Sequence, residues 1–255
     1  MGPSGIFFDL YGTLVILHEN RRAWDAWHEE LLKFVRTEKG VAAAQKAASC
    51  LAGFWEGAEG GGNSNETVFE YKIARFLEGL DIHPPKTRVG ELANNLCKVW
   101  QDQLRVDPDA VPVLSALQPE VPLGLVTNFD HPPHVHRIMR DFNFSTFFRV
   151  VVISAEEMIK KPDPRILVLA CERAQCIPEK SYYVGDSIVD YKAAKGASMT
   201  PILIRRVGQS EVEGNYTGSN NYVESDKLLA DLVHRGDLLQ IENLREILDL
   251  KLPLL

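Results

Sequence analysis

Five short apolar runs are spread along the chain, and each is continuous rather than alternating with polar residues. The runs are residues 6–8 (IFF), 122–126 (PLGLV), 150–153 (VVVI), 182–184 (YYV) and 201–204 (PILI). Continuous apolar runs of this length are typical of parallel strands that are buried on both faces. We therefore expect these five runs to form the strands of one parallel sheet.

Segments with the apolar spacing of helices lie between most of the predicted strands. They are residues 110–117, 135–142, 165–174 and 189–197. The third of these follows Pro162, Asp163 and Pro164, which are common residue types at the start of a helix. Alternating strands and helices predict an α/β fold, a Rossmann-like doubly wound parallel sheet with right-handed crossovers.

Residues 16–107 have a different pattern, in which apolar side chains recur every three or four positions around Trp24, Phe69 and Val89. Together with residues 41–55, this spacing predicts roughly four helices and no strand. We expect a small helical bundle inserted after the first strand, with its aromatic residues serving mainly to pack the helices together.

The insertion suggests two domains. Residues 1–15 and 108–255 are expected to form the α/β core, and residues 16–107 the helical domain. Two polar stretches rich in Gly, Ser and Asn are predicted to be surface loops, and a last segment is predicted to be a closing helix. These are the loops at residues 57–65 and 207–225 and the helix at 242–250.

Composition and net charge limit the classes of partner and the cellular location that we expect for the protein. The chain of 255 residues has a formal net charge of -7, which disfavours nucleic acid or an anionic membrane as the main partner. No C-x-x-C pair, signal peptide or membrane-length apolar run is present in the sequence. We expect a cytoplasmic protein with reduced cysteines, whose oligomeric state the sequence leaves open.

Polar residues that could bind a ligand or take part in catalysis lie at the ends of the predicted strands. Asp9 follows the first strand, Thr127 and Asn128 the second and Asp186 the fourth, while Lys161 lies in the loop after the third. Ligands of open parallel sheets bind outside the carboxyl ends of the strands. These five side chains are therefore expected to face one crevice.

Four short motifs on these residues resemble those of the haloacid dehalogenase (HAD) superfamily. They occur in the family's order as residues 9–14 (DLYGTL), 127–128 (TN), 161–162 (KP) and 185–190 (GDSIVD). The helical insert resembles that family's cap domain, which closes over the site. The resemblance implies a HAD-like fold and a magnesium-dependent hydrolase acting on a small phosphorylated molecule.

The resemblance also implies roles for individual residues. Asp9 would be the nucleophile, since a carboxylate is ionised at neutral pH and can attack phosphorus directly. Lys161 would restrain Asp9 and neutralise the phosphate, and we choose it over Lys160 because the family places its lysine immediately before the proline. Thr127 and Asn128 would donate hydrogen bonds to phosphate oxygens.

A metal site follows from the same motifs. Asp186 and Asp190 would converge with Asp9, and three carboxylates at one place favour a bound cation. Oxygen ligands suit Mg²⁺. The implied ligands are Asp9, the backbone carbonyl of Tyr11, and Asp186. Asp190 would be a ligand, an outer partner or simply the cap of a helix.

Tyr11 departs from the family pattern, because phosphatases of the family usually carry a second Asp there as general acid and base. A phenol can donate a proton but is a poor base. A Tyr here also resembles the haloacid dehalogenases themselves, which are metal-free and lack the complete fourth motif. His18, His28 and Asp130 are candidates to replace the missing carboxylate.

The sequence is compatible with three functions. A phosphatase of a small phosphorylated metabolite, acting through an aspartyl-phosphate on Asp9, is favoured because the fourth motif is complete. The alternatives are a 2-haloacid dehalogenase using Asp9 and a catalytically weak HAD-like binding protein. A surface metal cluster of His131, His134 and His136 is less favoured than a polar helix start, because their spacing fits no standard site.

Overall fold

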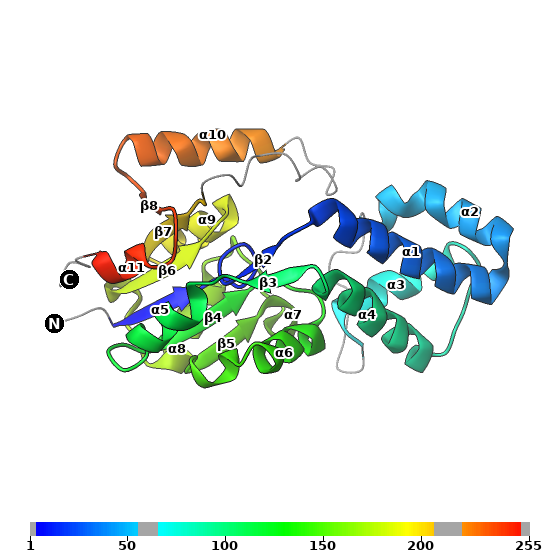
Figure 1. Ribbon diagram of the computed structural model, residues 1–255, viewed down its shortest axis with the longest axis horizontal. Coiled ribbons are helices and arrows are strands. Elements are labelled where there is room, and N and C mark those ends of the chain that lie inside the picture. The colour runs from blue at the N-terminus through cyan, green and yellow to red at the C-terminus, as the bar shows by residue number, and fades with distance from the viewer. Residues whose placement is uncertain (1–3, 56–65, 207–220, 251–255) are drawn as a thin grey trace.

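The computed structural model describes residues 4–55, 66–206 and 221–250 of the chain (Figure 1). It has an α/β part and, at one end of the molecule, a helical part. The α/β part contains a parallel six-stranded sheet in the order β5-β4-β1-β6-β7-β8. Its strands are β1 (Gly5–Phe8), β4 (Leu123–Thr127), β5 (Val150–Ile153), β6 (Ser181–Gly185), β7 (Thr200–Ile204) and β8 (Leu239–Ile241).

The sheet confirms the predicted fold class. All five apolar runs are strands, because both faces of the sheet are covered. Ile6 and Phe8 of β1 pack on one side, with α5 (Ala110–Leu117) and α6 (Pro132–Asp141). Phe7 points to the other side, where α8 (Arg165–Ala174) and α9 (Ile188–Gly196) cover the sheet.

The end of the chain differs from the prediction. Residues 221–225, expected in a loop, belong to helix α10 (Asn221–His234), while residues 207–220 and the predicted loop at 57–65 lie outside the described residues. β8 was not predicted, because two of its three residues are exposed and it lacks a continuous apolar run. The expected closing helix is confined to α11 (Glu246–Asp249).

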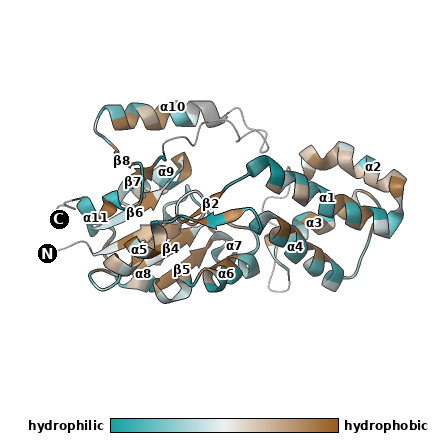
Figure 2. Cartoon of the chain, in the orientation of Figure 1, coloured by the Kyte–Doolittle hydropathy of each residue, from teal (hydrophilic) through white to brown (hydrophobic). Residues whose placement is uncertain are grey.

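Among the described residues, the helical part has four α-helices, which pack around an apolar centre and carry hydrophobic stretches beside hydrophilic ones (Figure 2). Leu31, Ile73, Leu77 and Leu96 are fully buried there, at the three- and four-residue spacing seen in the sequence. The helices are α1 (Asn20–Lys39), α2 (Val41–Cys50), α3 (Val68–Glu78) and α4 (Lys86–Gln101), with a 3₁₀ turn η1 (Leu51–Trp55) after α2.

Two short strands join the helical part to the sheet, and the expectation of no strand in the insert was wrong. β2 (Val15–Leu17) leaves the α/β part and β3 (Leu104–Val106) returns to it, and the two pair in antiparallel fashion. Each has only three residues, too few for a periodic pattern to show in the sequence. They form a ribbon through which both chain crossings pass.

One guanidinium holds this ribbon against the sheet. Arg206, just after β7, donates hydrogen bonds from Nη1 to the Gly12 carbonyl (2.5 Å) and from Nη2 to the Thr13 carbonyl (2.6 Å). It also pairs with the buried carboxylate of Asp107, which follows β3 (2.6 Å). The outgoing and returning chain segments are therefore bound to the same side chain.

None of the described helices is both long enough and apolar enough to cross a membrane.

Candidate active site

Asp9 lies at the carboxyl end of the central strand β1, in a tight turn. Its N–H donates to the Val184 carbonyl of β6 (2.9 Å), which fixes the start of the turn. Gly12 has a φ of +76°, and a Cβ at this position would lie 2.0 Å from Oδ2 of Asp186. Glycine is therefore required at residue 12 for both its backbone conformation and the close approach of Asp186.

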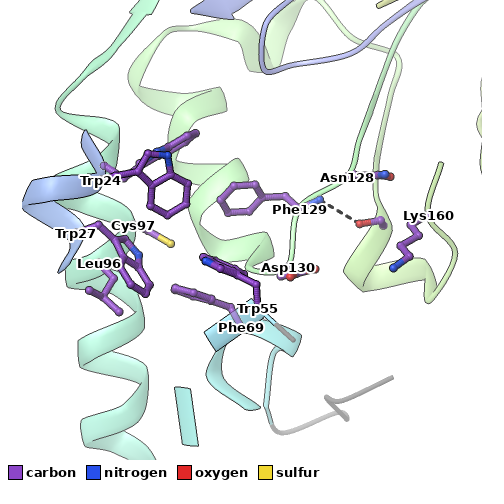
Figure 3. A pocket seen from close by; sticks show the side chains of 12 residues that line it. Trp24, Trp27, Trp55, Phe69, Leu96, Cys97, Asn128, Phe129, Asp130 and Lys160 are labelled. Carbon is purple, nitrogen blue, oxygen red and sulfur yellow. Dashed lines mark hydrogen bonds between the residues drawn. The ribbon is translucent and has the colours of Figure 1, made fainter. Parts of the chain in front are cut away.

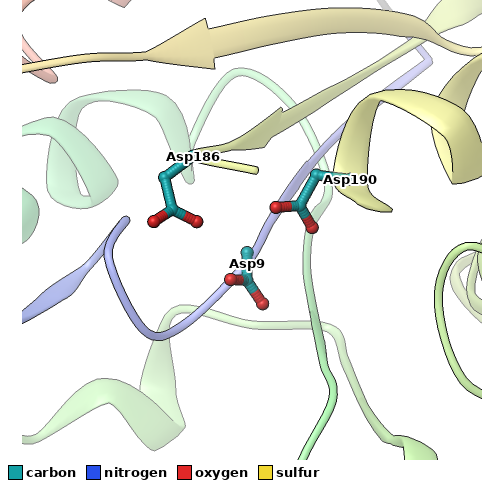
Figure 4. Close-up of side chains that lie close together, drawn as sticks. All are labelled: Asp9, Asp186 and Asp190. Atoms are coloured by element: carbon teal, nitrogen blue, oxygen red, sulfur yellow. The ribbon is translucent and has the colours of Figure 1, made fainter. Parts of the chain in front are cut away.

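Three carboxylates meet at this edge of the sheet (Figure 4). Asp9, Asp186 and Asp190 each offer an oxygen, and these oxygens lie within 4.8 Å of one another. Asp9 follows β1, Asp186 follows β6, and Asp190 lies in the first turn of α9. Adjacent parallel strands bring these residues together although they are far apart in the sequence.

Lys161 lies among these carboxylates. Its Nζ is 2.6 Å from Oδ1 of Asp9 and 2.7 Å from Oδ1 of Asp190, and its side chain is 2% exposed. It also donates to the Tyr183 hydroxyl (2.8 Å). Lys160, by contrast, is exposed. The structure therefore places Lys161 in the site and Lys160 at its rim.

The three carboxylates of the site carry more negative charge than Lys161 can neutralise. Burial raises the pKa of Asp9 to about 6, although Lys161 opposes the shift. Burial, together with the charges of Asp190 and Asp9, raises the pKa of Asp186 well above its usual value. Burial alone would lower the pKa of Lys161, but Asp190 and Asp9 outweigh it and the pKa is raised. Three carboxylates around one lysine are a donor set that fits a divalent cation with oxygen ligands.

Asp190 differs from the other two carboxylates because the protein occupies both of its oxygens. Oδ2 accepts hydrogen bonds from the N–H of Ser187 (3.1 Å) and from the Ser187 hydroxyl, in a capping box at the start of α9. Oδ1 accepts from Lys161 and Tyr183. Asp190 thus caps α9, which is one of the alternatives that the sequence left open, and its other oxygen holds Lys161.

Thr127 and Asn128 have different environments. The Thr127 hydroxyl is buried and has no hydrogen-bond partner among the described residues. Asn128 donates from Nδ2 to the Lys161 carbonyl and accepts at Oδ1 from the Lys161 N–H, both at 2.9 Å. The side chain of Asn128 therefore fixes the lysine loop, and its predicted hydrogen bond to phosphate stays a prediction.

Tyr11 packs into an aromatic cluster, and its hydroxyl makes no hydrogen bond to Asp9. Its ring stacks on Phe129 (5.0 Å between centroids) and lies 5.3 Å from Trp100 of α4. The hydroxyl is buried without a partner among the described residues, and burial, with smaller contributions from Cys97 and Asp9, raises its pKa well above 10. A phenol in this environment is a weak proton donor.

We expect the Tyr11→Phe variant to keep its phosphate release within about twofold of wild type. Removing a buried hydroxyl without a partner should raise the free energy of unfolding by about 1 kcal/mol. Urea denaturation and steady-state kinetics measure the two effects. A tenfold or larger loss of kcat at unchanged stability would instead assign the hydroxyl a direct role.

The other candidates for the missing acid lie in different surroundings. His18 is exposed beside Glu19, with 71% of its side chain accessible. His28 packs against Trp24 and Trp27 in the helical part. Asp130 forms an ion pair with Lys72 of α3 (2.6 Å) and so links the two parts of the molecule.

The three histidines after β4 face different neighbours. Nδ1 of His131 lies 3.0 Å from the Thr67 hydroxyl, and His136 pairs with Glu156 (2.8 Å). His134 stacks on Phe129, and burial lowers its pKa to about 3. Among the described residues, only the three aspartates form a group with metal-binding geometry.

Sequence reasoning missed Tyr183, whose hydroxyl donates to the Val126 carbonyl (2.9 Å) and accepts from Lys161. A signal was present in the sequence. Tyr183 occupies the middle of a buried strand, where a phenol hydroxyl needs a polar partner. Such a tyrosine marks a polar group inside the sheet.

The doubly wound sheet, with three carboxylates and a buried lysine at the carboxyl edge of its strands, indicates a hydrolase. The chain belongs to the haloacid dehalogenase-like hydrolase family, whose sequence model matches residues 3–198. This confirms the resemblance that the four motifs indicated.

Relatives with assigned activities match only part of the chain. Phosphoglycolate phosphatase of Escherichia coli (strain K12) is 38% identical over 91 residues, 35% of this chain and 36% of that protein. Glyceraldehyde 3-phosphate phosphatase of Methanopyrus kandleri is 34% identical over 112 residues, 43% of this chain and 48% of that protein. The chain thus matches about a third to a half of the length of these relatives.

Solved structures match nearly the whole chain. A HAD phosphatase from Thermococcus onnurineus has a TM-score of 0.61 at 20% identity and covers 97% of this chain and 96% of its own. A 2-haloacid dehalogenase from Pseudomonas syringae pv. Tomato has the same TM-score at 18% identity, with coverage of 98% and 97%. Phosphatase and dehalogenase are equally similar in shape, so these matches establish the fold and leave the reaction to the site.

Proposed function

We propose that this protein is a magnesium-dependent phosphatase of small phosphorylated molecules, which forms an aspartyl-phosphate on Asp9. One observation carries the proposal. Asp9 is bound by the buried Lys161, and an oxygen of Asp186 lies within 4.8 Å of it. A nucleophilic carboxylate, a fixed positive charge and an acidic group suited to Mg²⁺ together match the needs of phosphoryl transfer.

The proposed reaction has two steps. An oxygen of Asp9 forms a bond to phosphorus while the bond from phosphorus to the ester oxygen breaks, and the leaving alkoxide takes a proton from a water molecule, which becomes hydroxide. A second water molecule then attacks phosphorus and loses a proton to that hydroxide, while the bond between phosphorus and Asp9 breaks, which releases phosphate and restores the Asp9 carboxylate. The Tyr11 hydroxyl makes no hydrogen bond to Asp9 and its pKa is raised by burial, so we assign both proton transfers to water.

The other residues act by charge and position. Lys161 would neutralise the phosphoryl oxygens, and the unpartnered hydroxyl of Thr127 would donate a hydrogen bond to one of them. Mg²⁺, when bound, would offset the negative charge shared by the carboxylates and the phosphate. Its ligands would be Asp9, Asp186 and the backbone carbonyl of Tyr11, with Asp190 behind them.

Further observations support the proposed substrate class, the cap domain and the cellular location. The aligned relatives are named as phosphatases of phosphoglycolate and glyceraldehyde 3-phosphate, which favours phosphate esters over haloacids. We propose that residues 16–107 act as a cap over the core formed by residues 1–15 and 108–255, since their helices pack around a separate apolar centre. A cytoplasmic location remains part of the proposal, and the four unpaired cysteines agree with a reducing compartment.

A phosphate-release screen with and without Mg²⁺ tests this function. Ester hydrolysis should require added Mg²⁺ and stop on chelation with EDTA, while 2-chloropropionate should release no halide. Full turnover in EDTA would contradict the metal assignment. Metal-independent halide release would make the protein a dehalogenase.

A further inference from the structure

A cavity of about 290 Å³ lies between the helical part and the loops at the carboxyl edge of the sheet (Figure 3). The helical part contributes mostly large apolar side chains to its wall. These include Trp24 and Trp27 of α1, Trp55 at the end of η1, Phe69 of α3 and Trp100 of α4. The volume is near the lower end of the range of about 300–1,000 Å³ usual for ligand pockets.

The tryptophans of the chain are gathered around this cavity. The sequence has four tryptophans, and all four line the cavity. Trp55 and Phe69 stack with an angle of 10° between their rings, and Trp24 lies edge-on to both Trp27 and Trp55. Aromatic walls of this kind favour a flat apolar group lying against them, through stacked and edge-to-face contacts.

The opposite side of the cavity is polar and adjoins the catalytic residues. Asn128 lines it there just after β4, Ser154 at the start of the short helix α7 (Ser154–Glu157) that follows β5, and Lys160 beyond α7. Asn128 also binds the backbone of Lys161, whose Nζ contacts Asp9. Asp9 does not itself line the cavity, but Tyr11, two residues after it, packs on Phe129 and Trp100, which do. A phosphate ester with phosphorus at Asp9 would thus have its alcohol part beside the aromatic wall.

This wall does not suit the short polar alcohol parts of phosphoglycolate or glyceraldehyde 3-phosphate. Neither can cover the tryptophan rings, so water would remain against apolar surface. A ring-bearing group would displace that water, at a gain of about 25 cal/mol for each Å² of apolar surface removed from it.

We propose that the substrate is a phosphate monoester whose alcohol part carries an aromatic or similarly flat apolar ring, bound in this cavity with the phosphate toward Asp9 and Lys161. This inference rests on the proposed phosphatase function and names its substrate class. It separates this chain from the aligned relatives, whose named substrates lack a ring.

Matched esters test the proposal without interference from chemical reactivity. 2-Phenylethyl phosphate and ethyl phosphate have similar leaving groups and differ in the ring. We expect kcat/KM with Mg²⁺ to be at least about 100-fold higher for 2-phenylethyl phosphate, since single methylene groups in apolar pockets already contribute about 10-fold or more. A ratio near one, with either ester hydrolysed, would overturn the ring preference and leave the phosphatase function intact.

A pair of variants on α1 links the preference to the cavity. Trp24→Ala should lower the ratio between the two esters about tenfold, and Trp24→Phe should restore most of it. Phe34→Ala is the matched control, because Phe34 lies on the same helix but contacts Arg88 away from the cavity. An equal fall of the ratio in Phe34→Ala and Trp24→Ala would contradict the assignment.

Binding gives a readout that does not need turnover, because every tryptophan of the chain lines the cavity. Titration with the non-hydrolysable 2-phenylethylphosphonate should change the intrinsic fluorescence to saturation, whereas ethylphosphonate should leave it nearly unchanged. No change with the phenyl compound would overturn the proposal. Saturation without hydrolysis of any ester would overturn the phosphatase function instead, so the two failures are distinguishable.

Discussion

Replacing Asp9 by Asn should lower kcat for phosphate release by about 10⁴-fold or more, the usual cost of removing a nucleophile. An amide cannot attack phosphorus as the carboxylate does, although it nearly keeps its shape. The variant should fold, because loss of one carboxylate reduces the repulsion among the three acidic groups around Lys161. The loss should therefore lie in chemistry and not in stability.

Two measurements check this result. Acid quenching during turnover, followed by mass spectrometry, should find a phosphoryl group on the wild-type peptide containing Asp9 and none in the variant. Asp231→Asn, at an exposed position on α10, is the control and should behave as wild type. Phosphoryl transfer to a different residue, or unchanged turnover in the Asp9 variant, would refute the nucleophile assignment.

Replacing Lys161 by Met should be the most destabilising of the changes considered. The lysine is 2% exposed in its side chain and contacts both Asp9 and Asp190. Removing one partner of a buried ion pair leaves unpaired charge, which costs about 3–5 kcal/mol. Phosphate release should also fall sharply, because the positive charge beside the phosphoryl oxygens is lost.

The destabilisation should depend on pH. Asp9 already has a raised pKa of about 6 with the lysine present, and without it the pKa rises further. A carboxyl group whose pKa is higher in the folded than in the unfolded state destabilises the fold fully above the folded-state pKa. The penalty disappears as pH falls from the folded-state pKa to the unfolded-state pKa. The variant should thus lose most stability at neutral and alkaline pH and recover part of it below pH 6.

Urea unfolding of Lys161→Met across this pH range measures the effect, with Lys195→Met on the exposed face of α9 as the control. The surface variant should stay within about 0.5 kcal/mol of wild type. A Lys161 variant as stable as the control at neutral pH would show that the carboxylates do not depend on this charge.

Much of the fold was predictable because the sheet is covered on both faces. Side chains of β1 alternate between the two covering layers, as Ile6 and Phe7 do, so both have to be apolar and the run is continuous. The strands that escaped prediction lack this condition. β8 has two exposed residues among three, and β2 and β3 form a separate two-stranded ribbon.

The meeting of Asp9, Thr127 and Asp186 at one edge of the sheet was predictable because each directly follows a predicted strand, and parallel strands end at a common edge. The details depended on packing that one sequence does not encode locally. Tyr11 faces Trp100, which is 89 positions away and is brought near by the insert. The amide of Asn128 turns toward the Lys161 backbone because a complete pair of hydrogen bonds is available there.

The attachment of both chain crossings to Arg206 limits how the four helices can move. The ion pair between Lys72 and Asp130 is a second attachment of the helices. Once that pair opens, we expect the helices to rotate about the outgoing and returning segments held by Arg206 rather than slide along the sheet. Displacement in a rotation grows with distance from the axis, so Gly12 beside Arg206 would hardly move while the side chains farthest from it travelled most. Substrate entry would then leave the geometry around the nucleophile undisturbed.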